Sequence, residues 1–236
     1  MFRIIVTGAG RGIGHDTVLA LAARGDCRVL ALSRNQDRLE LLQQEARSRF
    51  PGTTVEIGFL DLEKEIPADF AEWATSILGG VDVLLHNAGL LVRKPFSELD
   101  RTDWLRLFTV NVFGAAELTK AMLPWLSRSG RAHVVHIGSM GGFQGSAKFP
   151  GLSAYSASKA AMACLAECLA EEWKGSAIAA NCLAIGAVQT EMLEEAFPGY
   201  QAPLDSKEMA AFIADFALNG HRFFNGKVLP VSVSTP

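Results

Sequence analysis

The sequence has no long uninterrupted apolar run. A membrane-spanning helix needs about 18 or more consecutive apolar residues, whereas the best candidate, residues 81–92, is broken by Asp82, His86 and Asn87. The first strand is expected to start by about Arg3, which leaves no room for a secretory signal peptide. These features predict a soluble, cytoplasmic protein that does not act at a membrane.

Cysteine is scarce, and its spacing fits neither a disulfide framework nor a zinc site. The four cysteines are Cys27, Cys164, Cys168 and Cys182. Cys164 and Cys168 are one helical turn apart, but no second pair of Cys or His stands at a spacing that would complete a metal site. We therefore expect small thiols packed in a core or an interface, and no bound metal.

An excess of basic residues is also absent. Lys and Arg total 22 against 25 Asp and Glu, so the formal net charge is 22 − 25 = −3. Nucleic-acid-binding surfaces usually show a basic excess, so the sequence predicts no nucleic-acid partner. Hydrophobic residues make up 49% of the chain, which is enough for a buried core. With no linker or internal repeat, residues 1–236 are expected to form one domain.

Segments with strand character and segments with helix character alternate along the chain. Short apolar runs typical of strands lie at residues 2–7, 28–32, 54–60, 81–86, 133–137, 177–183 and 227–233. Helical patterns lie at residues 17–23, 37–50, 68–78, 102–126 and 154–173. A last helix is expected between the capping-box pair Asp205 and Glu208 and the stop at Gly220. This alternation predicts an α/β fold with a doubly wound, mostly parallel sheet of about seven strands and helices on both faces.

Two irregular segments, residues 140–153 and 191–203, follow expected strands and are rich in Gly, Pro and Phe. In an open parallel sheet, ligands bind beyond the carboxyl ends of the strands. Both segments are therefore candidate walls of a substrate pocket, and plain surface loops are the alternative. The side chains that could line such a pocket are Phe143, Phe149, Leu193, Phe197 and Tyr200.

The segment TGAGRGIG, residues 7–14, joins the first expected strand to the first expected helix. Gly8, Gly12 and Gly14 would allow a tight turn, close approach of the backbone to a pyrophosphate, and close packing of helix on strand. The following helix would present unpaired N–H groups and a partial positive charge to the phosphates. In this position the turn predicts a dinucleotide site of the Rossmann type.

The segment YSASK places Tyr155 and Lys159 four residues apart on an expected helix. Side chains at this spacing share one helix face, with Cβ atoms roughly 5–6 Å apart. An ammonium at ~4 Å, with an effective dielectric of about 20, favours a phenolate by about 4 kcal/mol. That would bring the phenol pKa from ~10 to about 7. The pair is therefore expected to act as an acid–base catalyst, although the bare pattern is also common in exposed helical pairs.

These motifs resemble those of the single-domain short-chain dehydrogenase/reductase (SDR) family, and the resemblance covers nearly the whole chain. The glycine turn has the spacing G-x3-G-x-G, and the later motifs follow in the family's order. They are DL at Asp61–Leu62, NAG at Asn87–Gly89, Asn111 in NVFG, Ser139 in HIGS, YSASK at 155–159, and IGAVQT at 185–190. The resemblance implies an oxidoreductase that transfers hydride between a nicotinamide cofactor and a carbonyl or alcohol.

The resemblance also implies catalytic roles for the residues that match. Tyr155 would donate the proton, Ser139 would orient the substrate carbonyl, and Lys159 would bind the nicotinamide ribose. Asn111 would hold a water that links Lys159 to solvent.

A cofactor-binding set follows from the same resemblance. Asp61 would contact the adenine ring, and Asn87 would support the sheet beside the adenosine ribose. Val188 and Thr190 would hold the carboxamide of the nicotinamide. The full expected set is Gly8, Arg11, Gly12, Ile13, Gly14, Ser33, Arg34, Asp61, Leu62, Asn87, Ala88, Gly89, Tyr155, Lys159, Gly186, Val188 and Thr190.

The end of the second expected strand bears on the choice of cofactor. NAD-specific folds normally place an acidic residue there to hold the ribose hydroxyls. Here Ser33 takes that place, Arg34 follows, and Arg11 lies inside the glycine turn. Two guanidiniums and a hydroxyl with no carboxylate predict a 2′-phosphate site, and therefore NADP(H) in preference to NAD(H). The alternative is that Arg34 only caps the loop and Arg11 is solvated.

Three features depart from the family pattern. Ile185 replaces the proline that is usual before Gly186, so that turn is expected to be less rigid. His86 stands where Asn is common and is expected to be a satisfied structural histidine. Ser139 and Tyr155 are 16 residues apart, more than is common, so we expect an elaborated substrate loop between them.

The sequence therefore predicts an NADP(H)-dependent carbonyl reductase or alcohol dehydrogenase with a small-molecule substrate. Three alternatives stay open: a reductase of 3-oxoacyl groups on an acyl carrier protein, a nucleotide sensor without turnover, and a methyltransferase with an adenosyl cofactor. Glu167, Glu171 and Glu172 make the end of the Tyr155 helix acidic, which disfavours docking of an acidic carrier. The family resemblance also implies a homodimer or homotetramer.

Overall fold

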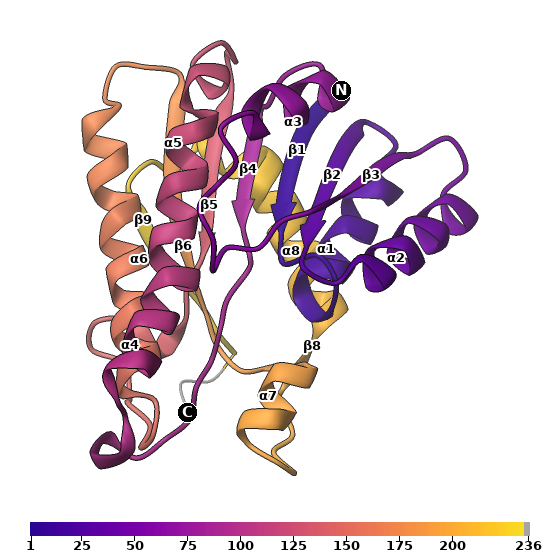
Figure 1. The fold of residues 1–236 in the computed structure, drawn as a ribbon. Helices are drawn as coiled ribbons and strands as arrows, with labels where there is room; N and C mark the ends of the chain where they lie inside the picture. The colour runs from indigo at the N-terminus through magenta and orange to yellow at the C-terminus, as the bar shows by residue number, and fades with distance from the viewer. Residues whose placement is uncertain (234–236) are drawn as a thin grey trace.

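The computed structural model describes residues 1–233. At its centre is a seven-stranded sheet in the order β3-β2-β1-β4-β5-β6-β9, and all its neighbouring strands run parallel (Figure 1). Its strands are β1 (Phe2–Thr7), β2 (Cys27–Ser33), β3 (Thr54–Phe59), β4 (Val83–His86), β5 (Ala132–Ile137), β6 (Ile178–Ile185) and β9 (Lys227–Val231). The strand order reverses between β1 and β4. A reversal of this kind opens a crevice at the carboxyl ends of the two strands.

Helices cover both faces of the sheet (Figure 1). They are α1 (Gly12–Ala23), α2 (Gln36–Arg49), α3 (Phe70–Leu78), α4 (Arg101–Phe108), α5 (Gly114–Leu126), α6 (Ser153–Glu172), α7 (Glu191–Ala196) and α8 (Ser206–Asn219). The short elements are the 3₁₀ turns η1 (Phe96–Glu98), η3 (Met140–Gly142) and η4 (Gly220–Arg222), the π-helical turn η2 (Thr109–Phe113), and a separate two-stranded sheet of β7 (Val188–Gln189) and β8 (Leu204–Asp205).

Two apolar cores lie on the two faces of the sheet, because successive side chains of a strand point to opposite sides. Ile4 and Val6 of β1 belong to one core, to which α1, α2 and α8 contribute. Ile5 between them belongs to the other core, to which α3, α5 and α6 contribute. All three side chains are fully buried. The predicted doubly wound α/β fold is thus confirmed.

Helix boundaries show where the sequence predictions were incomplete. The helix expected over residues 102–126 is interrupted by the π-helical turn Thr109–Phe113. The first helix begins at Gly12, five residues before the expected start, because the glycine turn itself continues into the helix. Residues 191–203 were expected to be irregular, but Glu191–Ala196 are helical, with Thr190 as the N-cap that accepts a hydrogen bond from the Leu193 N–H at 3.2 Å.

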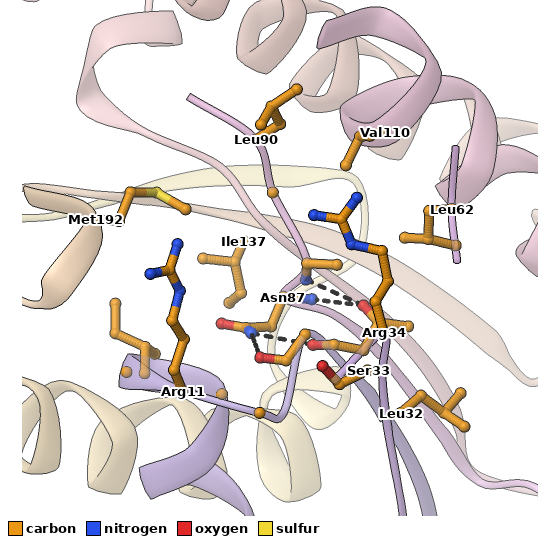
Figure 2. Close-up of a pocket in the computed structure, with 18 of the residues that line it drawn as sticks. Arg11, Leu32, Ser33, Arg34, Leu62, Asn87, Leu90, Val110, Ile137 and Met192 are labelled. Atoms are coloured by element: carbon orange, nitrogen blue, oxygen red, sulfur yellow. Dashed lines mark hydrogen bonds between the residues drawn. The ribbon is translucent and has the colours of Figure 1, made fainter. Parts of the chain in front are cut away.

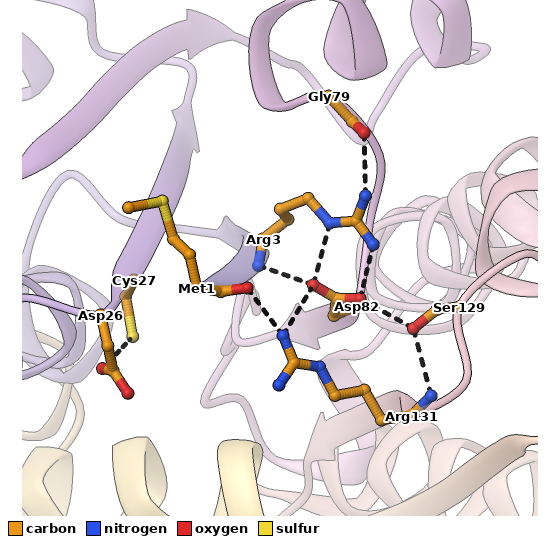
Figure 3. Close-up of polar contacts among 8 residues, drawn as sticks. All are labelled: Met1, Arg3, Asp26, Cys27, Gly79, Asp82, Ser129 and Arg131. Carbon is orange, nitrogen blue, oxygen red and sulfur yellow. Dashed lines mark hydrogen bonds and ion pairs between the residues drawn. The ribbon is translucent and has the colours of Figure 1, made fainter.

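The amino-terminal edge of the sheet holds a buried ionic cluster, shown in Figure 3. The Asp82 carboxylate is 2% exposed and accepts hydrogen bonds from the Arg3 guanidinium at 2.7 and 2.9 Å and from the Arg3 backbone N–H at 3.0 Å. Ser129 donates to it at 2.7 Å, and Arg131 lies at 3.8 Å. Burial alone would raise the pKa of Asp82, but the hydrogen bonds from Arg3 and Ser129 prevail and hold that pKa below its ordinary value.

The four cysteines are unpaired, as expected, but they occupy two different environments. Cys27 and Cys182 are buried, whereas Cys164 and Cys168 are exposed on α6. Of the two expected environments, core or interface, the core applies to Cys27 and Cys182, and an interface position for the α6 pair stays a prediction. Within residues 1–233, no helix combines the length and apolar character needed to cross a bilayer.

Candidate active site

A cavity of about 450 Å³ lies at the carboxyl ends of the central strands. Fifteen of the residues expected from the sequence line it: Gly8, Arg11, Gly12, Ile13, Gly14, Ser33, Arg34, Asp61, Leu62, Asn87, Ala88, Gly89, Tyr155, Lys159 and Thr190. They come from segments that are far apart in the sequence and meet because parallel strands end at the same edge of the sheet. Figure 2 shows Arg11 and Arg34 on either side of Asn87 in this cavity.

The glycine turn is held against the NAG segment. Gly8 has φ 68°, a left-handed conformation that favours glycine, and a Cβ atom there would lie 2.7 Å from Cα of Ala88. The Asn87 side-chain amide donates to the carbonyl oxygens of Thr7 at 3.0 Å and Gly8 at 3.1 Å (Figure 2). A larger residue at position 8 would therefore push the two segments apart.

The N-terminus of α1 fits an anion. Among the described residues, no side chain caps it, and its first turn contains no acidic residue. Its first backbone N–H groups, at Gly12, Ile13 and Gly14, line the cavity. Unpaired N–H groups and the helix dipole favour a phosphate at this place. The glycine cradle and the helix end together fit the pyrophosphate of a dinucleotide.

Three arginines, Arg11, Arg34 and Arg38, line the same cavity, and each is ion-paired with a carboxylate. Arg34 Nη1 lies 2.6 Å from Glu63 Oε1. Arg11 Nη1 lies 3.1 Å from Glu191 and 2.9 Å from Glu195, and the Arg11 side chain is 40% exposed. The positive charges of these arginines are thus paired within the chain.

The third arginine, Arg38, was missed by the sequence analysis. It lines the cavity, and its Nη1 lies 3.0 Å from Glu191 Oε2. A Cβ atom at Gly10 would lie 2.8 Å from Ser33 Oγ and 3.6 Å from Cβ of Arg38, so the glycine turn, Ser33 and Arg38 meet closely. Arg34 lies in the turn before α2, whereas Arg38 lies in the first turn of that helix, three residues after its N-cap Asn35, so a search limited to the end of the strand could not find it.

Tyr155 is half-buried at the cavity wall, near the start of α6. Burial raises the pKa of its phenol, and a hydrogen bond with Ser139 opposes part of that rise. Ser139 follows β5, and its Oγ also accepts a hydrogen bond from the Gly141 N–H at 3.1 Å. The structure therefore brings Ser139 and Tyr155 together despite the 16 residues between them.

Lys159 does not act on Tyr155 as the sequence analysis expected. Its Nζ donates to the Ile137 carbonyl oxygen at 2.8 Å and lies 5.9 Å from the centre of the Tyr155 ring. Burial lowers the pKa of Lys159 to about 8. The expected lowering of the phenol pKa is therefore wrong for this structure, because burial raises that pKa and only the hydrogen bond with Ser139 opposes the rise.

Asn111 lies in the π-helical turn and is fully buried. Its Oδ1 accepts from the Leu90 N–H at 2.7 Å, while its Nδ2 donates to the Leu90 carbonyl and to Ser158 Oγ, both at 2.9 Å. A Cβ atom at Gly89 would lie 3.2 Å from Lys159 Nζ and 3.6 Å from Asn111 Oδ1. Asn111 thus joins the NAG segment to α6 beside Lys159.

Four expected residues, Asn111, Ser139, Gly186 and Val188, are not among the described residues that line the cavity. The Val188 side chain is 4% exposed and packs in the apolar core, so its side chain is not placed to hold a carboxamide. The Gly186 N–H donates to the Val231 carbonyl at 2.9 Å, which ties this turn to β9. Ile185, the departure from the family pattern, does line the cavity.

His86 is buried, as expected, but only one of its ring nitrogens is bonded within the described chain. Its Nε2 lies 2.7 Å from Thr119 Oγ1, and Nδ1 has no partner among residues 1–233. The ring stacks on His136 at a centroid distance of 4.8 Å. Burial lowers the pKa of both histidines, to about 3 for His136, so the pair is neutral at physiological pH. In the described part of the chain, no cluster of three or more His, Cys, Asp or Glu could hold a metal ion.

The chain matches a family model and several curated relatives. Residues 3–201 match the family model described as short chain dehydrogenase. An uncharacterized oxidoreductase of Myxococcus xanthus is 34% identical over 192 residues, which cover 80% of this chain and 72% of that protein. A dehydrogenase/reductase SDR family protein 7-like of Drosophila melanogaster is 31% identical over 201 residues, and these span 83% of this chain but only 60% of the relative.

Solved structures show the same fold over nearly the full chain. A putative short chain dehydrogenase from Pseudomonas syringae superposes with a TM-score of 0.88 at 30% identity, covering 97% of this chain and 94% of that one. A putative short chain dehydrogenase from Shigella flexneri, complexed with NADP, gives a TM-score of 0.87 at 28% identity, with 97% and 96% covered. The fold and the cleft thus define a Rossmann-like α/β protein of the kind that binds nicotinamide dinucleotides. Within that class, the chain belongs to the short-chain dehydrogenase family, which is a family of oxidoreductases.

Proposed function

We propose that the chain is an NADP(H)-dependent oxidoreductase that interconverts a carbonyl compound and the corresponding alcohol, with Tyr155 as general acid and base. The observation that carries this proposal is a single cavity lined both by Tyr155 and Lys159 and by the glycine turn with its arginines. An anion site and a proton donor in one cavity suit hydride transfer from a phosphorylated cofactor to a substrate placed beside the phenol.

The nature of the donors supports a dinucleotide with a 2′-phosphate. The uncapped start of α1 suits the pyrophosphate, while Ser33, Arg34 and Arg38 line the cavity where an NAD-specific protein would carry an acid. Several related structures contain this cofactor, including the NADP complex from Shigella flexneri. When bound, the nicotinamide would supply or accept the hydride.

The chain's own residues would move and position the proton. Tyr155 would donate it to the substrate oxygen, and the Ser139 hydroxyl would hydrogen-bond that oxygen. Lys159 would bind ribose hydroxyls, and Asn111 would anchor the backbone at Leu90 beside it and hold a water on the path from Lys159 to solvent. Positioned proton donors of this type contribute typically 10²–10⁴-fold to rate.

The protonation states favour reduction at neutral pH. Carbonyl reduction needs a protonated phenol as donor, whereas alcohol oxidation needs the phenolate as acceptor. Burial raises the pKa of Tyr155, so the donor form prevails at pH 7. The proton donor that carbonyl reduction needs is therefore available at neutral pH.

The proposed substrate is small and has apolar character. The side chains predicted to line its pocket, Phe143, Phe149, Leu193, Phe197 and Tyr200, are not among the described residues that line the cofactor cavity. Phe149 lines a second pocket, together with Ser156 on α6. Phe149, from the segment before α6, contacts Phe197, just after α7, at a ring distance of 6.2 Å. Arg93 lies over the Phe197 ring at 4.5 Å and donates to the Ala196 carbonyl, so its charge is already engaged. This arrangement suits a ketone or aldehyde with a hydrophobic substituent better than a carboxylate.

A carrier-bound 3-oxoacyl chain is the second candidate. A 3-oxoacyl-[acyl-carrier-protein] reductase of Thermotoga maritima is 28% identical over 191 residues, which favours it. The exposed acidic residues Glu167, Glu171 and Glu172 at the end of α6 disfavour an acidic carrier. A free carbonyl compound is therefore the first candidate.

The test measures NADPH oxidation with a panel of ketones, aldehydes and 3-oxoacyl thioesters. We expect turnover with at least one free carbonyl compound, and a loss of kcat of about 1,000-fold in Tyr155→Phe, within the range for a lost general acid. NADPH should bind both proteins with a Kd equal within twofold. If the chain binds NADPH but turns over no member of the panel, the result would contradict the proposed reductase and favour the nucleotide-sensor alternative.

The proposal also covers the oligomeric state and the location of the protein. We expect a homodimer or homotetramer that pairs through the face formed by α5 and α6, where Phe113 is 47% exposed between α4 and α5. Light scattering measures this directly, and a strictly monomeric chain would contradict it. A cytoplasmic location remains a prediction from the sequence.

A further inference from the structure

Two carboxylates of α7, Glu191 and Glu195, form ion pairs with arginines that line the cofactor cavity. Arg11 Nη1 is paired with both Glu191 at 3.1 Å and Glu195 at 2.9 Å, and Arg38 Nη1 is paired with Glu191 at 3.0 Å. Glu191 is therefore shared by two guanidiniums that line the same cavity. These pairs join segments 153 to 184 residues apart in the sequence.

The placement of α7 makes these contacts possible. Thr190 caps this short helix and also lies against the glycine turn, because a Cβ atom at Gly12 would lie 3.4 Å from Thr190 Cγ2. Glu191 and Glu195 are four residues apart, so they share the helix face that is turned toward Arg11. In Figure 1, α7 lies beyond the carboxyl ends of the strands, on the side of the sheet edge where α1 begins.

The paired side chains are ionised, but the ion pairs themselves are weak because they are exposed to solvent. Hydrogen bonds from Arg11 and then Arg38 keep the pKa of Glu191 below its ordinary value, so the carboxylate is ionised at neutral pH. The side chains remain accessible, with 40% exposure for Arg11, 51% for Glu191 and 65% for Glu195. Exposed ion pairs of this kind contribute about 0–1 kcal/mol. A phosphate carries about −1.5 to −2 charges and can bind arginine through two oxygens, so it can displace them.

We propose that Glu191 and Glu195 are internal competitors of the ribose 2′-phosphate and set the strength of the preference for NADP(H) over NAD(H). In the free protein they hold Arg11 and Arg38 in place of the phosphate. A nucleotide with a 2′-phosphate must release these pairs, whereas a nucleotide without it leaves them intact. The inference rests on the proposed NADP(H) site and assigns a role there to two acidic residues on α7.

The test is calorimetric binding of two ligands that lack the nicotinamide, 2′-phospho-ADP-ribose and ADP-ribose. We expect Glu191→Gln/Glu195→Gln to bind the 2′-phosphorylated ligand 3- to 10-fold more tightly than the parent does. Binding of ADP-ribose should change less than twofold. The Kd for ADP-ribose divided by the Kd for 2′-phospho-ADP-ribose should therefore rise. A tenfold change corresponds to about 1.4 kcal/mol.

Glu194→Gln is the matched control. Glu194 lies on the same helix and carries the same charge, but its Oε1 accepts a hydrogen bond from the Gly199 N–H at 3.0 Å, which glutamine can keep. We expect its ratio of Kd values to equal that of the parent. An equal gain in Glu194→Gln would show a general effect of charge and overturn the competitor role.

The outcomes separate this inference from the proposed function. A parent that prefers the 2′-phosphorylated ligand, with a ratio unaffected by the double substitution, would leave the NADP(H) site standing and refute the role of Glu191 and Glu195. A parent that binds neither ligand would refute both. Thermal unfolding of each variant, expected within a few degrees of the parent, checks that the fold is retained.

Discussion

The two ends of the parallel sheet use ion pairs in opposite ways. At the amino end, Asp82 is 2% exposed, and its carboxylate is bound by partners fixed in the fold, chiefly Arg3 (Figure 3). At the carboxyl end, Arg11 and Arg34 are 40% and 53% exposed and pair with carboxylates on a short helix and a loop. A carboxylate buried under several hydrogen bonds is costly to separate from its partners, whereas an exposed pair can give way to a ligand. The first end therefore stabilises the protein, and the second is suited to binding.

The largest effect is expected from Ser139→Ala at the carboxyl end, which should lower kcat without lowering stability. Removing one hydrogen-bond donor to a developing oxyanion typically lowers kcat by about 100- to 1,000-fold, or about 3–4 kcal/mol. Steady-state kinetics with the best substrate of the panel should show this loss. The midpoint of thermal unfolding and the Kd for NADPH should stay close to those of the parent, and a large fall in either would make Ser139 a structural residue.

Asp82→Ala at the amino end should do the reverse. Removing one partner of a buried pair costs about 3–5 kcal/mol of unfolding free energy, and we expect about 3 kcal/mol because Arg3 can turn to solvent. Denaturant titration measures it, with Glu65→Ala, an exposed carboxylate outside the helices and strands, as a control that should stay within about 0.5 kcal/mol. The kcat of the folded fraction should not change, and a lower kcat would contradict the separation of the two ends.

Lys159 should link the catalytic end to stability through pH. Its pKa is about 8 in the folded chain and about 10.4 in the unfolded chain. Between these values the unfolded chain binds a proton that the folded chain does not, so unfolding free energy rises with pH. Relative to Lys159→Met, the parent should gain up to about 3 kcal/mol from pH 8 to about 10.4. Parallel curves for the two proteins would show that the amine is not buried in this way.

The smallest expected effect concerns the cofactor preference. Arg34→Ala should lower the ratio of kcat/KM for NADPH over NADH about tenfold, which corresponds to about 1.4 kcal/mol. Arg106→Ala is the control, because Arg106 binds the same Glu63 carboxylate at 3.1 Å but is not among the described residues that line the cavity. Its ratio should stay within twofold of the parent. Equal kcat/KM values for the two cofactors in the parent would contradict the NADP(H) proposal itself.

Much of the fold could be predicted because it depends on local patterns. The buried strands read as short apolar runs, and the Asp205–Glu208 capping box forms at the start of α8 as expected. The π-helical turn was not predicted, because nothing in a helical pattern shows that one turn is wider than the next. The helix α7 could have been found, since Thr190 followed by Glu191 and Glu194 is a typical N-terminal sequence for a helix.

The sequence predicted most of the residues that line the cavity but not the electrostatics of the site. Motif order was enough to bring Tyr155 and Ser139 together, because each motif follows a strand or opens a helix. The pKa of Tyr155 was predicted in the wrong direction, since burial and the engagement of Lys159 by the Ile137 carbonyl depend on the whole fold. The pairing of Arg11 with Glu191 spans 180 residues, and no local pattern predicts it.

The wider turn at Thr109–Phe113 constrains how the chain can vary. An α-helix advances by about 100° per residue, since it has 3.6 residues per turn. Deleting one residue from this turn would restore regular α-helical hydrogen bonding. It would also rotate Asn111 away from Leu90, whose backbone N–H and carbonyl are both hydrogen-bonded to the Asn111 side chain. Such a shortened chain would keep its helix and lose the anchor of the loop that faces Lys159. The extra residue is thus a spacer that sets the angular register between the two halves of a single long helix.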